Sequence, residues 1–285
     1  MSVRQLSYGV VLACLASLCA EVQATPLLGG SVSTAADTGR CRDDKQIPQT
    51  TQQDTFTLSG ATACGGQSAS VDLKGDAASA SVGLKASASG DGNGSASAAA
   101  MVSLYDSWLI GVPLGTLPGL ISIPVSLTLE GIISPGALNN LGSFLDYTMI
   151  INDHYLPQNR LEASGKVTTT GSFAQTVSGD VAFRYFDSAA LPMTADISIL
   201  LTMPQLIEGV LDFFNTASIS MTLADGFSAF TSSGLPLQFD VAQSETAEPG
   251  VGVLLVAGLG LVRVLEGRRR RVVPGASRLQ PTVAA

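Results

Sequence analysis

The middle of the chain is dominated by stretches in which apolar and polar side chains alternate one by one. Two such runs, 78–88 and 96–104, are separated by a glycine-, aspartate- and asparagine-rich stretch at 90–94. Because successive side chains of a strand point to opposite faces, this alternation predicts strands with one buried face. Glycine and asparagine accept the positive φ of tight turns. The two runs are therefore expected to form a long β-hairpin, and a flexible Ser/Ala/Gly linker is the alternative.

The same alternation predicts further strands along the chain. Pro124 lies within one of them and cannot donate a ladder hydrogen bond, so that strand is expected at a sheet edge or at a bulge. The stretches 167–177 and 181–186 flank Ser178-Gly179-Asp180 and predict a second hairpin. The remaining predicted strands are those beginning at Phe56 and those at 121–130, 144–151, 197–201, 219–223 and 235–241.

One segment has helical rather than strand spacing. Its apolar residues recur three and four positions apart, and Pro204 suits a first helical turn. Gly209 weakens the pattern, so helix and strand remain equal alternatives. These spaced residues are Leu206, Ile207, Val210, Leu211 and Phe214.

Many short strands with Gly/Ser-rich turns predict an all-β fold, namely an antiparallel β-sandwich that is jelly-roll-like. The sandwich domain is expected to span 56–243. Residues 25–55 are polar and rich in turn formers, and they predict a loosely held N-terminal segment. About 225 residues lie between the first twenty-four residues and the C-terminal apolar region, which is enough to bury a core without relying on disulfides.

The first twenty-four residues have the three parts of a secretory signal peptide. Arg4 provides the positive start, and 6–19 form a short apolar stretch. This stretch is shorter than the roughly 20 residues that a membrane-spanning helix needs. Small or branched residues then lead to Ala24, so cleavage is expected between Ala24 and Thr25.

The C-terminal region reads as a membrane signal. An apolar run at 251–262 follows Glu248 and Pro249, and four consecutive arginines close it: Arg268, Arg269, Arg270 and Arg271. Basic clusters remain on the cytoplasmic side of a membrane. We therefore expect an anchor segment at 244–271, a cytoplasmic tail at 272–285, and the domain outside. An ordinary single-pass membrane anchor is the simpler alternative.

This arrangement resembles the PEP-CTERM sorting signal of exosortase-dependent bacteria, with Glu248 and Pro249 at the motif and the arginine cluster at its end. The stretch 214–234 is also similar to the last strands that precede such anchors. The resemblance implies export, processing near Pro249 by an exosortase-like enzyme, and release or attachment at the cell surface. It further implies an association with exopolysaccharide and biofilm.

Charge and cysteine content narrow the range of functions that the chain can have. The whole chain carries a formal charge of −8, but residues 25–249 hold twenty-one acidic and only eight cationic side chains, a net charge of −13. Nucleic-acid binding is excluded on this ground, because phosphate contacts need Lys and Arg. Cys41 and Cys64 are the two cysteines that remain after signal removal. In an oxidising compartment they are expected to form one disulfide.

No catalytic set is evident in the sequence. His154, the single histidine, is expected to be a loop residue with a local hydrogen bond, because a triad needs a base held between a carboxylate and a nucleophile. The run 91–95 opens like a calcium loop, but Ala96 and Val102 stand where a glycine and a bidentate glutamate belong. No cofactor is therefore predicted. Calcium between loops stays open, with these candidates: Asp43, Asp44, Asp180 and Asp187.

The sequence thus predicts an exported, non-catalytic protein of the extracellular matrix, whose β-domain binds polysaccharide or packs with neighbouring proteins. Trp108 and Tyr105 could stack on a sugar, but they are more simply strand residues. Two alternatives remain. One is a secreted hydrolase acting on polysaccharide, since a carboxylate pair leaves a weak sequence signature. The other is an ordinary membrane-anchored surface domain.

Overall fold

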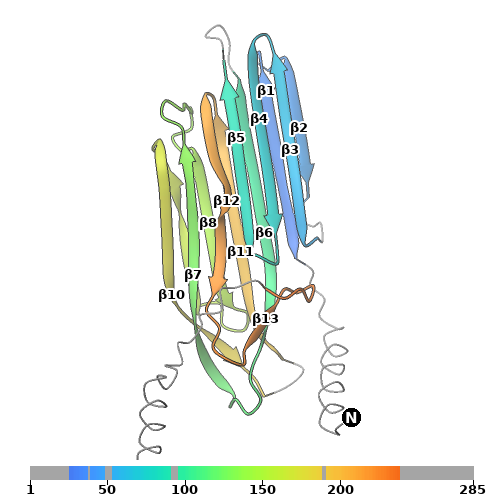
Figure 1. The fold of residues 1–285 in the computed structure, drawn as a ribbon, viewed down its shortest axis with the longest axis vertical. Helices are drawn as coiled ribbons and strands as arrows, with labels where there is room; N and C mark the ends of the chain where they lie inside the picture. Colours follow the sequence, from blue (N-terminus) through green and yellow to red (C-terminus); the bar gives the residue numbers. More distant parts are fainter. Residues whose placement is uncertain (1–25, 38, 49–52, 91–95, 188–190, 238–285) are drawn as a thin grey trace, which may run out of the picture. The chain divides into compact units, whose positions relative to one another are not determined.

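The structure of the chain is a computed structural model that describes residues 26–37, 39–48, 53–90, 96–187 and 191–237. Contacts divide the chain into two units, 1–242 and 243–285, and every described residue belongs to the first. Within this described part, thirteen strands form two antiparallel sheets (Figure 1).

The first sheet, called sheet A, has the strand order β2-β1-β6-β11-β8-β9, and the short β13 also pairs with β6. Its strands are β1 (Leu27–Ala36), β2 (Cys41–Ile47), β6 (Ser97–Gly111), β8 (Leu145–Asp153), β9 (Arg160–Val167), β11 (Met193–Leu206) and β13 (Ser228–Phe230). The second sheet, sheet B, has the order β10-β7-β12-β5-β4-β3. Its strands are β3 (Thr55–Cys64), β4 (Gln67–Asp76), β5 (Ser81–Ser89), β7 (Gly119–Ile133), β10 (Gly171–Tyr185) and β12 (Gly209–Met221).

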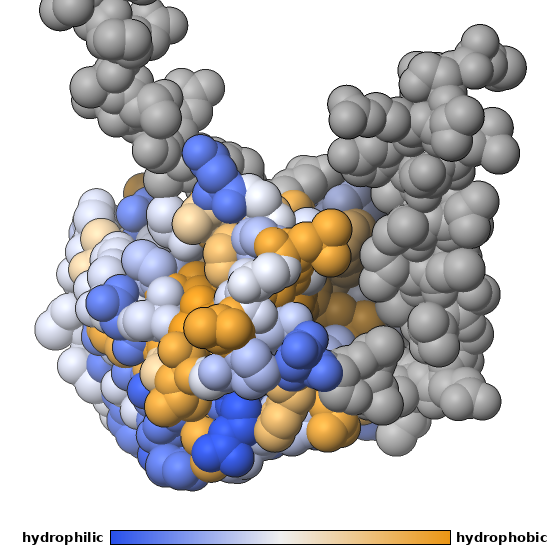
Figure 2. All heavy atoms as spheres, turned by 90° about the horizontal axis from the view of Figure 1, so that it is seen from below, coloured by the Kyte–Doolittle hydropathy of each residue, from blue (hydrophilic) through white to orange (hydrophobic). Residues whose placement is uncertain are grey.

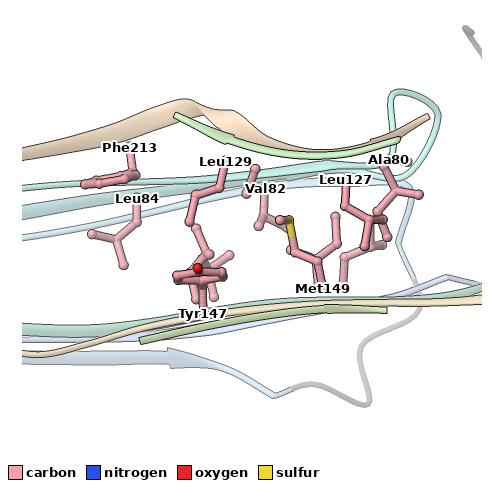
Figure 3. Packing of buried hydrophobic residues seen from close by; sticks show 14 of the residues in the cluster. Ala80, Val82, Leu84, Leu127, Leu129, Tyr147, Met149 and Phe213 are labelled. Carbon is pink, nitrogen blue, oxygen red and sulfur yellow. The ribbon is translucent and has the colours of Figure 1, made fainter. Parts of the chain in front are cut away.

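The two sheets pack face to face, which confirms the predicted all-β sandwich. Figure 3 shows Met149 and Tyr147 of sheet A pointing toward Leu84, Leu129 and Phe213 of sheet B. All but Tyr147, which is 6% exposed, are completely buried. A Val, Leu, Ile and Ala core of this kind forms because each strand contributes every second residue to the space between the sheets.

The first predicted hairpin is wrong in its pairing, although both strands exist. β5 pairs with β4 and β12 in sheet B, whereas β6 pairs with β1 and β11 in sheet A. Their inward side chains, such as Val82 and Val102, enter the same core from opposite sides. Alternation specifies only which face is buried, so strands that oppose each other across a core have the same pattern as strands paired in a hairpin.

The predicted loose segment at 25–55 is also wrong, because it contains β1 and β2 and the sandwich begins near residue 27. β1 is an interior strand of sheet A that pairs with both β2 and β6. Its buried side chains include Leu28 and Val32, while Ser31 and Ser33 lie on the outer face. This alternation is weak in the sequence because glycine and serine occupy so many of its positions.

The second predicted hairpin is a single strand. β10 runs through Ser178-Gly179-Asp180 without interruption and pairs with β7 over its whole length. Ser178 and Asp180 are exposed on the outer face, so the supposed turn residues simply continue the alternation. Three turn-forming residues do not break a strand when a long neighbouring strand pairs with the residues before and after them.

Pro124 lies in β7, which is an interior strand and not the predicted edge. Its carbonyl accepts a hydrogen bond from Thr222, so its missing N–H faces the β12 side. β12 ends at Met221, which pairs with Val125, just before Pro124 would need to donate. The proline is therefore tolerated because its neighbour strand stops there.

The helical alternative at 206–214 is wrong, because β12 begins at Gly209 and follows a tight connection from β11. Gly209 has a φ of +100°, a conformation that favours glycine. The strands predicted at 144–151, 197–201 and 219–223 correspond to β8, β11 and the end of β12. The last described strand, however, is β13, and no strand occurs at 235–237.

Candidate functional site

Several predicted functional residues lie outside the described residues. They are the cleavage pair Ala24 and Thr25, the motif residues Glu248 and Pro249, and the arginines 268–271. Across the part of the chain that the structure describes, no helix has the length and apolar character to cross a membrane.

The predicted disulfide between Cys41 and Cys64 is present, with the two Cα atoms 6.1 Å apart. It joins the start of β2 to the end of β3 and so links the two sheets at one corner. Two charged side chains of β2 reinforce this corner. Lys45 donates to the Ser59 carbonyl at 2.8 Å, and the Asp43 carboxylate accepts from the Ala61 N–H at 3.1 Å. These contacts cover the exposed backbone of edge strand β3.

His154 forms a three-residue cluster that sequence spacing does not reveal. Its Nδ1 lies 2.9 Å from the Asp196 carboxylate, which also accepts a hydrogen bond from the Ser107 hydroxyl at 2.7 Å. The carboxylate thus lies between the serine and the histidine. A catalytic triad needs the histidine in the middle, where it can take the serine proton. The cluster therefore lacks an activated nucleophile, and the partner comes from β11 rather than from nearby sequence.

Two carboxylates are buried because they hold backbone in place. Asp153 is completely buried and accepts hydrogen bonds from the Tyr155 and Arg184 N–H groups at 2.9 and 2.7 Å. Asp106 is 7% exposed and accepts from the N–H and hydroxyl of Ser232. Burial raises the pKa of Asp106, although the Ser232 hydrogen bonds partly oppose this rise. Both residues fasten loops to the sandwich.

The calcium candidates are not brought together. Asp43 is paired with Lys45 at 3.0 Å and Asp44 with Arg42 at 2.5 Å, whereas Asp180 is on β10 at the opposite edge of the sandwich. Within the described ranges, no group of three or more His, Cys, Asp or Glu side chains could hold a metal ion. Residues 91–95, whose sequence opens like a calcium loop, lie outside those ranges.

Serine and threonine hydroxyls are the main chemistry of the outer sheet faces. On sheet B they pair across neighbouring strands, as in Ser70 with Ser87 at 2.8 Å and Ser126 with Ser178 at 3.0 Å. Such pairs form because every second residue of adjacent strands points to the same face. Ion pairs such as Lys85 with Asp212 lie among these hydroxyls, so the faces are polar.

A shallow trough crosses the outer face of sheet A over β2, β1, β6 and β11, with a volume of about 530 Å³. Strand register places its residues in two rungs. One rung runs Gln46–Ser31–Met101–Thr202, and the next contains Asp44, Ser33 and Ala99. The short side chains of Ser31, Ser33 and Ala99 leave room, while longer side chains such as Gln46 and Met101 lie beside them. The volume is within the range of ligand sites in proteins.

Hydroxyls, the Gln46 amide and one carboxylate are among the polar groups that line this trough. The hydroxyls of Ser31, Ser33 and Thr202 can donate and accept, and the Asp44 carboxylate only accepts when ionised. A hydrogen bond with Ser33, followed by the contact with Arg42, lowers the pKa of Asp44, so this exposed group remains ionised in mildly acidic water. Tyr105 is 38% exposed further along the same face of β6, whereas Trp108 is buried in the core.

Sequence reasoning missed this trough because its residues come from the segment expected to be loose and from strands expected to pair differently. The short outward residues of 31–33 and 99–101 were a signal, but only the register of β1 with β6 brings them together. No model of a known protein family matches this sequence, and no curated protein matches it.

Proposed function

We propose that this chain is exported and acts outside the cytoplasm as a non-catalytic matrix protein that binds polysaccharide in the sheet A trough. The observation that carries the proposal is the trough itself, which is open and whose lining includes hydroxyls, the Gln46 amide, the Asp44 carboxylate and small side chains. An extended polyhydroxylated chain fits such a surface, because it can exchange hydrogen bonds with Ser31, Ser33 and Thr202 without placing a charge against the acidic domain.

The proposed export rests on the two chain ends and on the disulfide. Secreted proteins keep such bonds, whereas the cytosol reduces them. In this proposal the signal peptide ends at Ala24, and an exosortase-like enzyme processes the chain near Pro249. The membrane holds the 244–271 segment before that step.

An apolar end of the sandwich is consistent with a position close to a membrane. Figure 2 shows apolar side chains gathered over this end. Leu114 and Leu117, in the β6–β7 connection, are 101% and 82% exposed. The last described residue, Leu237, is at the same end, because its N–H bonds to the carbonyl of Ala229 in β13, which pairs with the end of β6. Thirteen residues then separate it from the predicted apolar run.

Filling the trough is expected to weaken polysaccharide binding. The double variant Ser31→Gln and Ala99→Gln places two long side chains on the trough floor, and both positions point outward, so the core is unaffected. We expect affinity for exopolysaccharide from the host to fall about tenfold, equivalent to ~1.4 kcal/mol of binding free energy. Affinity electrophoresis in gels containing the polymer measures the change.

Ser220→Gln is the matched control, since Ser220 is exposed on the outer face of sheet B and does not line the trough. Equal retardation of wild type, double variant and control would exclude the trough as the binding site. Shortening of the polymer during incubation would instead favour the alternative of a hydrolase.

Intact mass of the protein from its host tests the sorting part of the proposal. A mature chain that begins at Thr25 and ends near Glu248 or Pro249 is expected, because both signals would then have been processed. The measurement is made on envelope and medium separately. A chain that still carries Arg268–Arg271 would mean a permanent membrane anchor and no exosortase-like step.

A further inference from the structure

The four edge strands of the sandwich differ in how their backbones are protected. Edge strands expose N–H and C=O groups that can pair with another chain, and proteins usually block them with charged residues or covering groups. In sheet A, β2 carries charges of both signs, and β9 carries Arg160, Glu162 and Lys166. In sheet B, β3 is uncharged, but Lys45 and Asp43 cover its backbone.

β10 is the other edge of sheet B, and it is the longest of these four strands. Its side chains from Gly171 to Gly179 carry no charge, and no proline interrupts it. Among the described residues, side chains that hydrogen-bond to its free backbone are found only near its C-terminal end. The Asn159 amide donates to the Ala182 carbonyl at 3.0 Å, and the Asp153 carboxylate accepts from the Arg184 N–H.

Two independent observations show which backbone groups of β10 face away from the sheet. Ala182 and Arg184 use theirs for the covering bonds just described. Pro124 is paired with Asp180 but directs its own backbone groups toward β12. Pro124 and Asp180 therefore form a pair without mutual hydrogen bonds, and the backbone groups of Asp180 also face the free edge. Because the register of β10 with β7 is unbroken, every second residue of β10 directs its backbone groups the same way. The backbone groups of four more residues therefore face the free edge, namely Ser172, Ala174, Thr176 and Ser178. Among the described residues, none of these five has a backbone hydrogen-bond partner on the free side.

We propose that this free edge of β10 is a self-association site, where β10 of a second copy of the chain pairs antiparallel around a two-fold axis at Thr176. Each copy then contributes five N–H and five C=O groups. The sheets B of the two copies become one continuous sheet.

A second copy is the occupant because the edge is complementary to itself. An axis at Thr176 places Asp180 of each copy opposite Ser172 of the other, and Ala174 opposite Ser178. No like charges meet, and Thr176 faces Thr176 of the other copy, a pairing that is favourable in antiparallel sheets. On the core face, Phe173 and Val177 are only partly buried in one copy and gain cover from the facing strand.

Sedimentation velocity of the full chain over a range of concentrations tests this site. Thr176→Pro removes one N–H from each copy at the axis, and this N–H has no role inside the sandwich. Thr176→Val keeps the N–H and is the matched control. We expect wild type and the valine variant to form the same dimer. The proline variant should form this dimer with an affinity that is lower by about tenfold or more.

Charge variants test the same contact independently, in case the proline disturbs the folding of β10. Thr176 points outward and is exposed, so Thr176→Lys and Thr176→Glu are each expected to fold. Each variant alone places like charges face to face across the axis and should remain monomeric, while an equal mixture should restore dimers. A wild-type chain that stays monomeric at ~100 µM, or a mixture that forms no dimer while wild type does, would overturn the proposal.

Discussion

Replacing Gly83 by alanine is expected to destabilise the sandwich by about 3 kcal/mol, although the change adds a single methyl group on the outer face. A Cβ at this position would lie 1.7 Å from the carbonyl oxygen of Phe214 and 2.3 Å from its carbonyl carbon. The backbone of β12 comes so close because its pairing with β5 shifts register between Phe213 and Ala217. A backbone atom cannot swing aside as a side chain can, so the strands must separate.

Urea unfolding followed by circular dichroism measures this loss. Gly179→Ala is the matched control in the other half of sheet B, where a Cβ would meet only Leu161, at 3.3 Å from its Cδ1 atom. This variant should stay within about 1 kcal/mol of wild type, because the end of a leucine side chain can move. Equal destabilisation by the two substitutions would mean that the close approach at Gly83 is not what makes alanine unfavourable.

Removal of the disulfide is the second large effect. The double variant Cys41→Ser and Cys64→Ser should lower the free energy of unfolding by about 3 kcal/mol, because the bond closes a loop across 23 positions of the unfolded chain. For a domain of this size the melting temperature should fall by roughly 6–12 °C. Thermal melts of the variant and of wild type measure the change.

A reducing agent provides the internal control for this prediction. It should lower the melting temperature of wild type to that of the double variant and leave the variant unchanged. If the reducing agent also lowered the melting temperature of the variant, the loss would come from something other than the bond between Cys41 and Cys64.

Alternation predicted many of the strands and their buried faces, but it did not predict β1, β2, β4, β9 or β13. It also did not predict strand partners. The inward residues of β5 and β6 were identified correctly while the pairing was wrong, because alternation carries no information about the neighbour. Ser178-Gly179-Asp180 was read as a turn for a related reason. A local turn preference was outweighed by the β10–β7 ladder, which spans fifteen residues on each strand.

The candidate site depended even more on information that single strands do not contain. The disulfide needed only two cysteines, so it could be predicted. The trough needs Ser31, Met101 and Thr202 in one rung, and these residues are about seventy and one hundred positions apart. Ser31 belongs to the serine-rich strand β1, whose sequence resembles a loose polar segment. Few side chains of this strand, such as Leu28 and Val32, are large apolar residues of the core.

The strand order of sheet A also constrains when the protein can fold. β6 lies between β1, which ends some sixty residues before it, and β11, which begins some eighty residues after it. Sheet B has the same property, because β12 separates β7 from β5. The centre of each sheet is therefore completed only by strands near the end of the domain. A chain that emerges from a membrane N-terminus first would have to wait, with β1 to β10 unable to close their sheets, until the residues up to Met221 had followed.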